Sequence, residues 1–103
     1  MGRRMRIPLP EAEALSAEQA AVKAVALARA RKRGAREAIE VAQNRYIAAT
    51  VEVQQTSRSF ESLQRRQGAL EALNIAHDRY VITCVELGRA KRNLTEARIE
   101  KAS

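Results

Sequence analysis

The sequence predicts an all-α fold, organised as an antiparallel helical hairpin or coiled-coil bundle. Composition, an internal repeat and a heptad pattern lead to this prediction. The chain has 103 residues, enough for one domain, and it is 46% apolar but only 3% aromatic, with four Gly and two Pro. This composition suits long Ala-rich helices better than a β-sheet, which favours aromatic and β-branched residues and needs many turns.

Residues 1–10 are expected to form a flexible basic arm, and residues 11–103 a single helical domain. Two prolines stand two residues apart among three arginines in the arm, and prolines so spaced do not both fit inside a helix. The first helix begins either at Pro10 or about one turn later at Ser16, which has the spacing of a capping box with Gln19.

The internal repeat has an offset of 34 residues. Residues 34–46 align with residues 68–80, and seven of the thirteen positions are identical. Gly34 is either a bend, which would give three helices, or a position within one continuous helix. The reversal is expected at Gly68, because the heptad phase continues through Gly34 but slips by one residue across Gly68, and glycine readily ends helices. The resulting elements are two helices and one turn, at about residues 11–66, 69–101 and 67–68.

Heptad spacing gives each unit a column of large seam residues beside a column of small ones, such as Ala42 in the first unit and Ala76 in the second. Alternating sizes let two helices approach closely, with the large column of each over the small column of the other. Antiparallel packing is the economical arrangement for consecutive helices. The predicted seam residues are Ile39, Tyr46, Val53, Phe60, Leu73, Tyr80, Leu87 and Leu94.

A second apolar stripe lies on the far side of each helix from the seam. A solitary hairpin would leave this stripe in water and forgo about 25 cal/mol per Å² of apolar area that could be buried. We therefore expect a homo-oligomer, or packing against other proteins of an assembly, unless a third helix of the chain covers the stripe. The expected interface residues are Val41, Ile47, Val51, Ile75, Val81, Ile82 and Val85.

The formal net charge of +7 favours acidic partners. The densest basic cluster could bind anions or the phosphates of nucleic acid. A solvated helix surface is the simpler interpretation, because the cluster contains no aromatic residue and no recognised DNA- or RNA-binding motif. The candidate anion-binding residues are Arg29, Arg31, Lys32, Arg33 and Arg36.

The sequence predicts no catalytic residue, no metal site and no cofactor. His77 is the only histidine and Cys84 the only cysteine, and neither belongs to a recognisable catalytic or metal-binding motif. One cysteine cannot form an internal disulfide, so a reducing, cytoplasmic location is expected. No apolar run reaches the roughly 20 residues that a transmembrane helix needs.

These observations together predict a non-enzymatic structural or adaptor subunit, which self-associates through helical packing and docks an acidic partner in a larger assembly. The alternative is a nucleic-acid-binding accessory protein that uses the basic segment 29–36. An enzyme whose site forms only between copies of the chain is a more distant third hypothesis.

Overall fold

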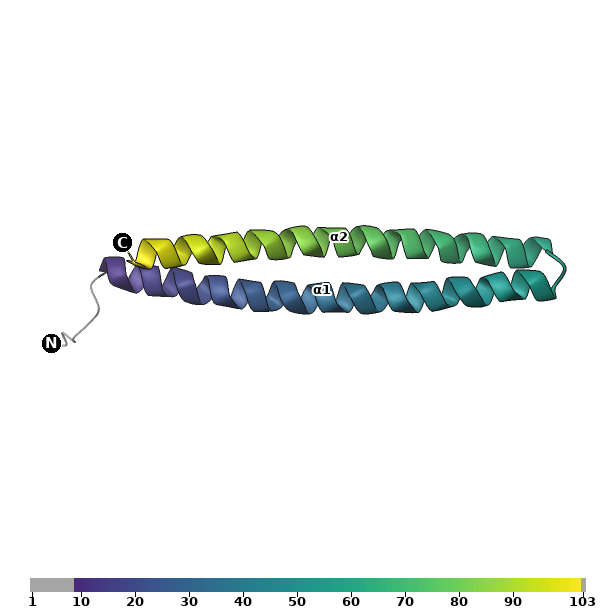
Figure 1. Cartoon of the computed structure of the whole chain (residues 1–103), viewed down its shortest axis with the longest axis horizontal. Coiled ribbons are helices and arrows are strands. Elements are labelled where there is room, and N and C mark those ends of the chain that lie inside the picture. Colours follow the sequence, from purple (N-terminus) through teal and green to yellow (C-terminus); the bar gives the residue numbers. More distant parts are fainter. Residues whose placement is uncertain (1–8, 103) are drawn as a thin grey trace.

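The chain folds into two long antiparallel helices, as seen in a computed structural model that describes residues 9–102. Helix α1 spans Leu9–Gln55 and helix α2 spans Phe60–Ala102, and no strand occurs within this range. The helices are about 70 and 65 Å long at 1.5 Å per residue, and they lie side by side along their length (Figure 1). The predicted all-α hairpin is confirmed. Gly34 lies inside α1, so residues 9–102 form two helices and not three.

Helix α1 begins at Leu9, next to Pro10, the earlier of the two predicted starts. Pro10 lies in the first turn, where a residue without an N–H group costs no intrahelical hydrogen bond. Ser16 lies further inside the helix and does not start it. Residues 1–8 of the predicted basic arm lie outside the described residues.

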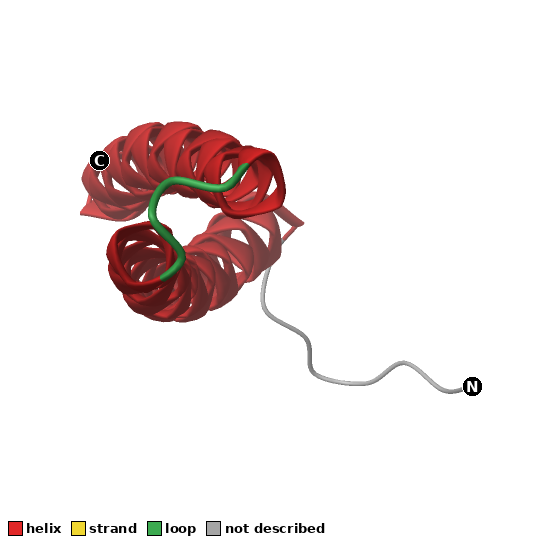
Figure 2. Cartoon of the chain, turned by 90° about the vertical axis from the view of Figure 1, so that its right-hand side faces the viewer, coloured by secondary structure: helices red, strands yellow, loops and turns green. Residues whose placement is uncertain are grey.

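The reversal lies at residues 56–59, so the predicted turn at residues 67–68 is wrong. Helix α2 runs straight through Gly68, and the two helices meet through a short loop at one end of the hairpin (Figure 2). The loop turns without glycine, because Ser57 and Arg58 adopt left-handed backbone conformations with φ angles of 55° and 61°.

Each helix end at the loop is capped. At the end of α1, the Arg58 N–H donates to the Val53 carbonyl at 2.9 Å, which is the closing bond of a Schellman motif with Ser57 in the place that glycine usually takes. At the start of α2, Ser59 is the N-cap, and its hydroxyl accepts a hydrogen bond from the Ser62 N–H at 3.2 Å. These caps fix the loop where the sequence carries no glycine or proline.

The heptad slip that had pointed to Gly68 belongs to this loop. The small column that runs along α1 ends at Thr56, the first residue of the loop, and the small column of α2 begins at Ser62, six residues later instead of seven. The heptad pattern includes Phe60 in the first helix, and this places the expected reversal after the actual loop at residues 56–59. Phe60 is 74% exposed at the start of α2, so its assignment to the seam is also wrong.

The seam packs large residues of one helix over small residues of the other. Val25 and Ala28 of α1 form a buried cluster with Leu87 and Ala90 of α2, and Leu94 packs against it. Seven residues further toward the loop on each helix, the next large residue of one helix meets the next small residue of the other. At the loop end, these steps pair Val53, which is 3% exposed, with the fully buried Ser62.

The seam residues other than Phe60 lie at the helix–helix contact. Val53 and Leu87 are buried, whereas the others are half-buried, as expected for a two-helix structure with a thin core. Six of the nine buried apolar side chains in the described part of the chain are alanines, which bring the helix backbones close together. The half-buried seam residues are Ile39, Tyr46, Leu73, Tyr80 and Leu94.

Ion pairs join the two helices near both ends of the hairpin. At the open end, Glu18 accepts hydrogen bonds from Lys101 Nζ at 2.9 Å and from Arg98 Nε at 3.2 Å. At the loop end, Arg65 Nε donates to Glu52 Oε1 at 2.7 Å. The hydrogen bond from Lys101 lowers the pKa of the Glu18 carboxyl, with a smaller contribution from Arg98, and the bond to Glu52 raises the pKa of Arg65.

Replacing Gly68 by alanine should stabilise the protein. The substitution Gly68→Ala is expected to raise the free energy of unfolding by about 0.5–1 kcal/mol, because the residue lies inside a helix and an added methyl group would meet no atom within 4 Å. Ser59→Ala removes the N-cap and should lower it by about 1 kcal/mol. Urea unfolding followed by circular dichroism, at one protein concentration, measures both. Destabilisation by Gly68→Ala would instead place a turn at Gly68.

The ion pairs at the open end should make stability depend on pH in a defined direction. The folded-state pKa of Glu18 is lowered, so its contribution is present above the unfolded-state pKa and is lost as the pH falls through the folded-state pKa. Glu18→Gln should therefore lower the melting temperature at pH 7, and the difference from the wild type should vanish in acid. Glu96→Gln, at an exposed residue outside the ion pairs, is the control. A difference that persists in acid would contradict this assignment.

Candidate anion-binding groove

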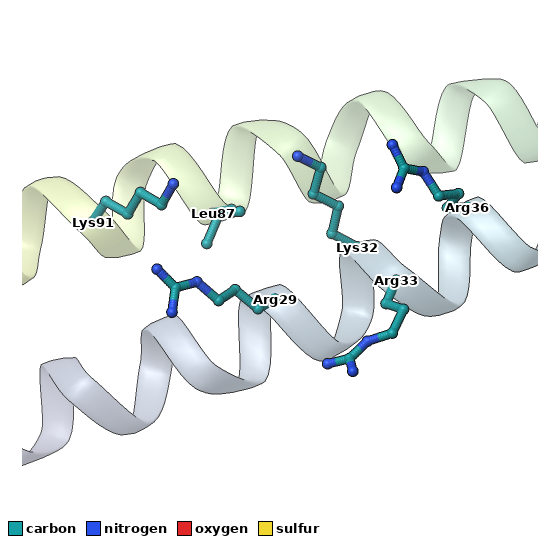
Figure 3. A pocket seen from close by; sticks show the side chains of 6 residues that line it. All are labelled: Arg29, Lys32, Arg33, Arg36, Leu87 and Lys91. Carbon is teal, nitrogen blue, oxygen red and sulfur yellow. The ribbon is translucent and has the colours of Figure 1, made fainter.

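A shallow groove between the two helices gathers five cationic side chains near the middle of the hairpin. Its volume is about 320 Å³, and it lies on one flank of the seam, open along one side (Figure 3). We call it the cationic groove. Its lining residues are Arg29, Lys32, Arg33 and Arg36 from α1, with Leu87 and Lys91 from α2.

The helical repeat explains why four cations of α1 share this groove. Residues three, four and seven positions apart lie on one face of an α-helix, and Arg29 is followed by cations at these three intervals. From α2, Lys91 projects toward the same space as Arg29, and Leu87 lies between the helices (Figure 3). Leu87 is buried in the seam, so it gives the groove an apolar wall.

The side chain of Lys32 contacts the other helix of the hairpin. It occupies a seam position, one heptad from Val25 and from Ile39, and its side chain is half-buried. Its Nζ atom lies 5.9 Å from the centre of the Tyr80 ring, within range of a cation–π interaction. Sequence reasoning assigned Lys32 to the basic cluster and Tyr80 to the seam separately, and the structure brings them together.

Arg31 does not belong to the groove. It lies on the opposite flank of the seam, where its Nη1 atom is 3.9 Å from Oε2 of Glu86. Four of the five predicted anion-binding residues therefore line the groove, and Lys91 is the cation that the sequence did not identify. Lys91 is remote from them along the chain, and only the register of the two helices could have revealed it.

No carboxylate lines the groove, although carboxylates balance cations elsewhere in the hairpin. Within residues 16–102, none of the five groove cations forms an ion pair, whereas Arg31, Arg65, Arg98 and Lys101 each do. Like charges three and four residues apart on a helix destabilise it slightly. The groove therefore concentrates uncompensated positive charge, and it can bind carboxylates or phosphates through charge-assisted hydrogen bonds.

The structure also places the residues considered for catalysis or metal binding. His77 is exposed and Cys84 is half-buried, and neither forms a side-chain hydrogen bond or ion pair with another described residue. Over the described residues, His, Cys, Asp and Glu side chains nowhere gather in a group of three or more suited to a metal ion. Within the same part of the chain, no helix contains an apolar stretch long enough to cross a membrane.

The seven predicted interface residues all lie in the open on the outer sides of the hairpin. Their side chains are 44 to 59% exposed, and their heptad positions point away from the seam. Val41, Ile47 and Val51 form the outer stripe of α1. The outer stripe of α2 consists of Ile75, Val81, Ile82 and Val85. Because each stripe faces away from the other helix, the two lie on opposite sides of the molecule.

Comparison with known proteins identifies no relative. No protein-family model, curated protein or solved structure matches the chain. The interpretation of the cationic groove and of the two outer stripes therefore depends on the physical chemistry of the chain's own residues.

Proposed function

We propose that this chain is a non-enzymatic structural or adaptor subunit, which self-associates through helical packing and docks an acidic partner in the cationic groove. The observation that carries the proposal is that five cationic residues from two helices line one groove, with no carboxylate among its lining residues. A cytoplasmic location is part of the proposal, since Cys84 is the only cysteine and cannot form an internal disulfide.

The dimensions of the groove favour a short acidic segment of a protein. Arg29 and Arg36 lie seven residues apart, about 10.5 Å along the helix, which is two helical turns. A partner helix with carboxylates at the same spacing would meet several cations at once. The guanidinium groups can each form paired hydrogen bonds with a carboxylate, and Leu87 offers an apolar contact beside them.

Binding of an acidic helical peptide should depend on the groove arginines. The probe is a labelled synthetic helix with glutamates at positions i, i+3, i+4 and i+7, and fluorescence anisotropy gives its Kd at low and at moderate salt. The triple variant Arg29→Gln, Arg33→Gln, Arg36→Gln should bind at least about tenfold more weakly, because one lost charge-assisted hydrogen bond alone is worth about 1.5 kcal/mol.

A matched variant separates the groove from the net charge. Lys23→Gln, Arg45→Gln, Arg79→Gln removes the same charge at exposed residues that form no ion pair with described residues. Its affinity should stay close to that of the wild type. Equal losses in both triple variants, or no loss in the groove variant, would refute docking in the groove.

Nucleic-acid binding is the second candidate function, and the net charge of +7 favours it. The groove itself argues against it, because no aromatic side chain lines it to stack on bases. The same variants decide between the two. Random duplex DNA and single-stranded RNA are tested at the same salt as the peptide. If either binds more tightly than the peptide and loses this binding in the groove variant, the partner of the groove is nucleic acid and not an acidic protein.

A further inference from the structure

The two outer stripes leave apolar surface on opposite sides of the hairpin. Residues 9–102 consist of α1 and α2 alone, side by side in a single layer, and neither helix reaches around to the outer side of the other (Figure 1). Seven large aliphatic side chains, each about half exposed, remain on these two sides. No third helix within residues 9–102 covers them, and apolar surface left open in this way is typical of an interface with another molecule.

We propose that the outer stripe of α1 in one copy packs against the outer stripe of α2 in a second copy, with the two helices antiparallel. This inference deepens the self-association in the proposed function, on which it rests, by naming the surfaces that meet. It assigns the stripes to different roles, so that each copy presents one α1 surface and one α2 surface.

The spacing of residues supports this pairing. In α1, Glu37, Val41 and Val51 follow at intervals of four and ten residues. In α2, the same intervals in reverse order separate Arg89, Val85 and Ile75. Antiparallel packing therefore brings Val41 onto Val85 and Val51 onto Ile75 while the carboxylate of Glu37 meets the guanidinium of Arg89.

The charges at the ends of the stripes add to this complementarity. The α1 stripe is preceded by Glu37 and Glu40, and the α2 stripe is followed by Arg89 and Arg92; all four residues are exposed, and none forms an ion pair with a described residue. The proposed register places Glu37 opposite Arg89, and Glu40 and Arg92 each lie about one helical turn from that pair. Attraction between Glu37 and Arg89 favours this register and the antiparallel orientation.

Pairing of identical stripes fits less well. Two α2 stripes packed antiparallel would bring the exposed Asp78 of each copy toward the middle of the contact, where the two carboxylates would repel each other. Two α1 stripes would place Glu37 and Glu40 near Gln54 of the other copy, without a cation in either stripe. Two α2 stripes would reproduce the spacing, because Glu71, Ile75 and Val85 repeat the intervals of Glu37, Val41 and Val51. They would, however, bring two Asp78 carboxylates into one contact and leave the α1 stripes uncovered, whereas the α1–α2 pairing brings in one Asp78 and covers both stripes.

A contact between unlike surfaces repeats from copy to copy. Each added hairpin exposes a new α1 stripe or α2 stripe, so the assembly is a closed ring or an open row and not a two-fold dimer. The residues of the outer stripes and those that line the cationic groove form separate sets.

Complementation between two blocked variants tests the pairing. The α1-blocked variant carries Val41→Lys and Val51→Lys, and the α2-blocked variant carries Ile75→Lys and Val85→Lys, all at exposed positions that the fold does not need. Sedimentation velocity of the full-length chain should show assembly of the wild type that increases with concentration. Each blocked variant alone should stay monomeric, whereas an equal mixture should give a heterodimer through the one intact stripe of each.

Two further variants complete the test. Val22→Lys with Gln43→Lys adds the same charge on the flank of the seam and should assemble like the wild type. Glu37→Arg should raise the concentration for half-assembly at least tenfold, and adding Arg89→Glu in the same chain should restore it. Circular dichroism verifies that each variant remains helical.

The outcomes separate this inference from the proposed function. A monomeric wild type would overturn self-association itself, while peptide docking in the groove would still be measured independently. Assembly of the wild type together with dimers of either blocked variant alone, or with no heterodimer in the mixture, would overturn the α1–α2 pairing only. Failure of Arg89→Glu to rescue Glu37→Arg would overturn the proposed register.

Discussion

The close approach of two helices along an alanine-rich seam is the constraint on which the rest of the structure depends. Alanines such as Ala28 and Ala90 leave space that Leu87 and Val25 of the opposite helix fill, and this matching sets the register of the hairpin. The register then decides which side chains of α2 meet the basic segment of α1. It brings Lys91 and Tyr80 beside that segment on one flank and Glu86 beside Arg31 on the other.

The loop shows how such a register is maintained at its closed end. Ser62 belongs to the small column of the seam and also to the cap of α2, because its hydroxyl donates to the Ser59 carbonyl at 2.9 Å and accepts from the Thr56 hydroxyl at 2.9 Å. A side chain of this size fits opposite Val53, and no buried side-chain polar atom of the described residues there lacks a hydrogen-bond partner. The small polar residues that end one helix and begin the next therefore continue the packing of the core without interruption.

Much of the fold could be predicted from the sequence, because the heptad repeat indicates which residues of each helix face the other helix. The large and small columns, including Leu87 and Ala76, lie where periodicity places them. The turn could not be placed by the same logic, because glycine at residue 68 suggested a helix end while the actual end uses Ser57 in a left-handed conformation. The run of small polar residues at 56–59, with a serine in N-cap position, was the signal available. Only part of the cationic groove could be predicted. Helical spacing groups Arg29 with its neighbours, but Lys91 lies beside them only because of how the two helices are aligned.

The separation of charge and apolar surface on this hairpin couples the two proposed activities. Each copy carries a formal charge of +7, so assembly brings like charges together and costs electrostatic free energy at low salt. An acidic partner bound in the groove neutralises part of that charge in every copy. We therefore expect docking and assembly to favour each other, since by thermodynamic linkage a partner that promotes assembly binds the assembled form more tightly than the monomer. In the assembly that we propose, the apolar stripes supply the attraction between copies, the groove sets its electrostatic cost through the bound partner, and the seam keeps groove and stripes on separate faces of each hairpin.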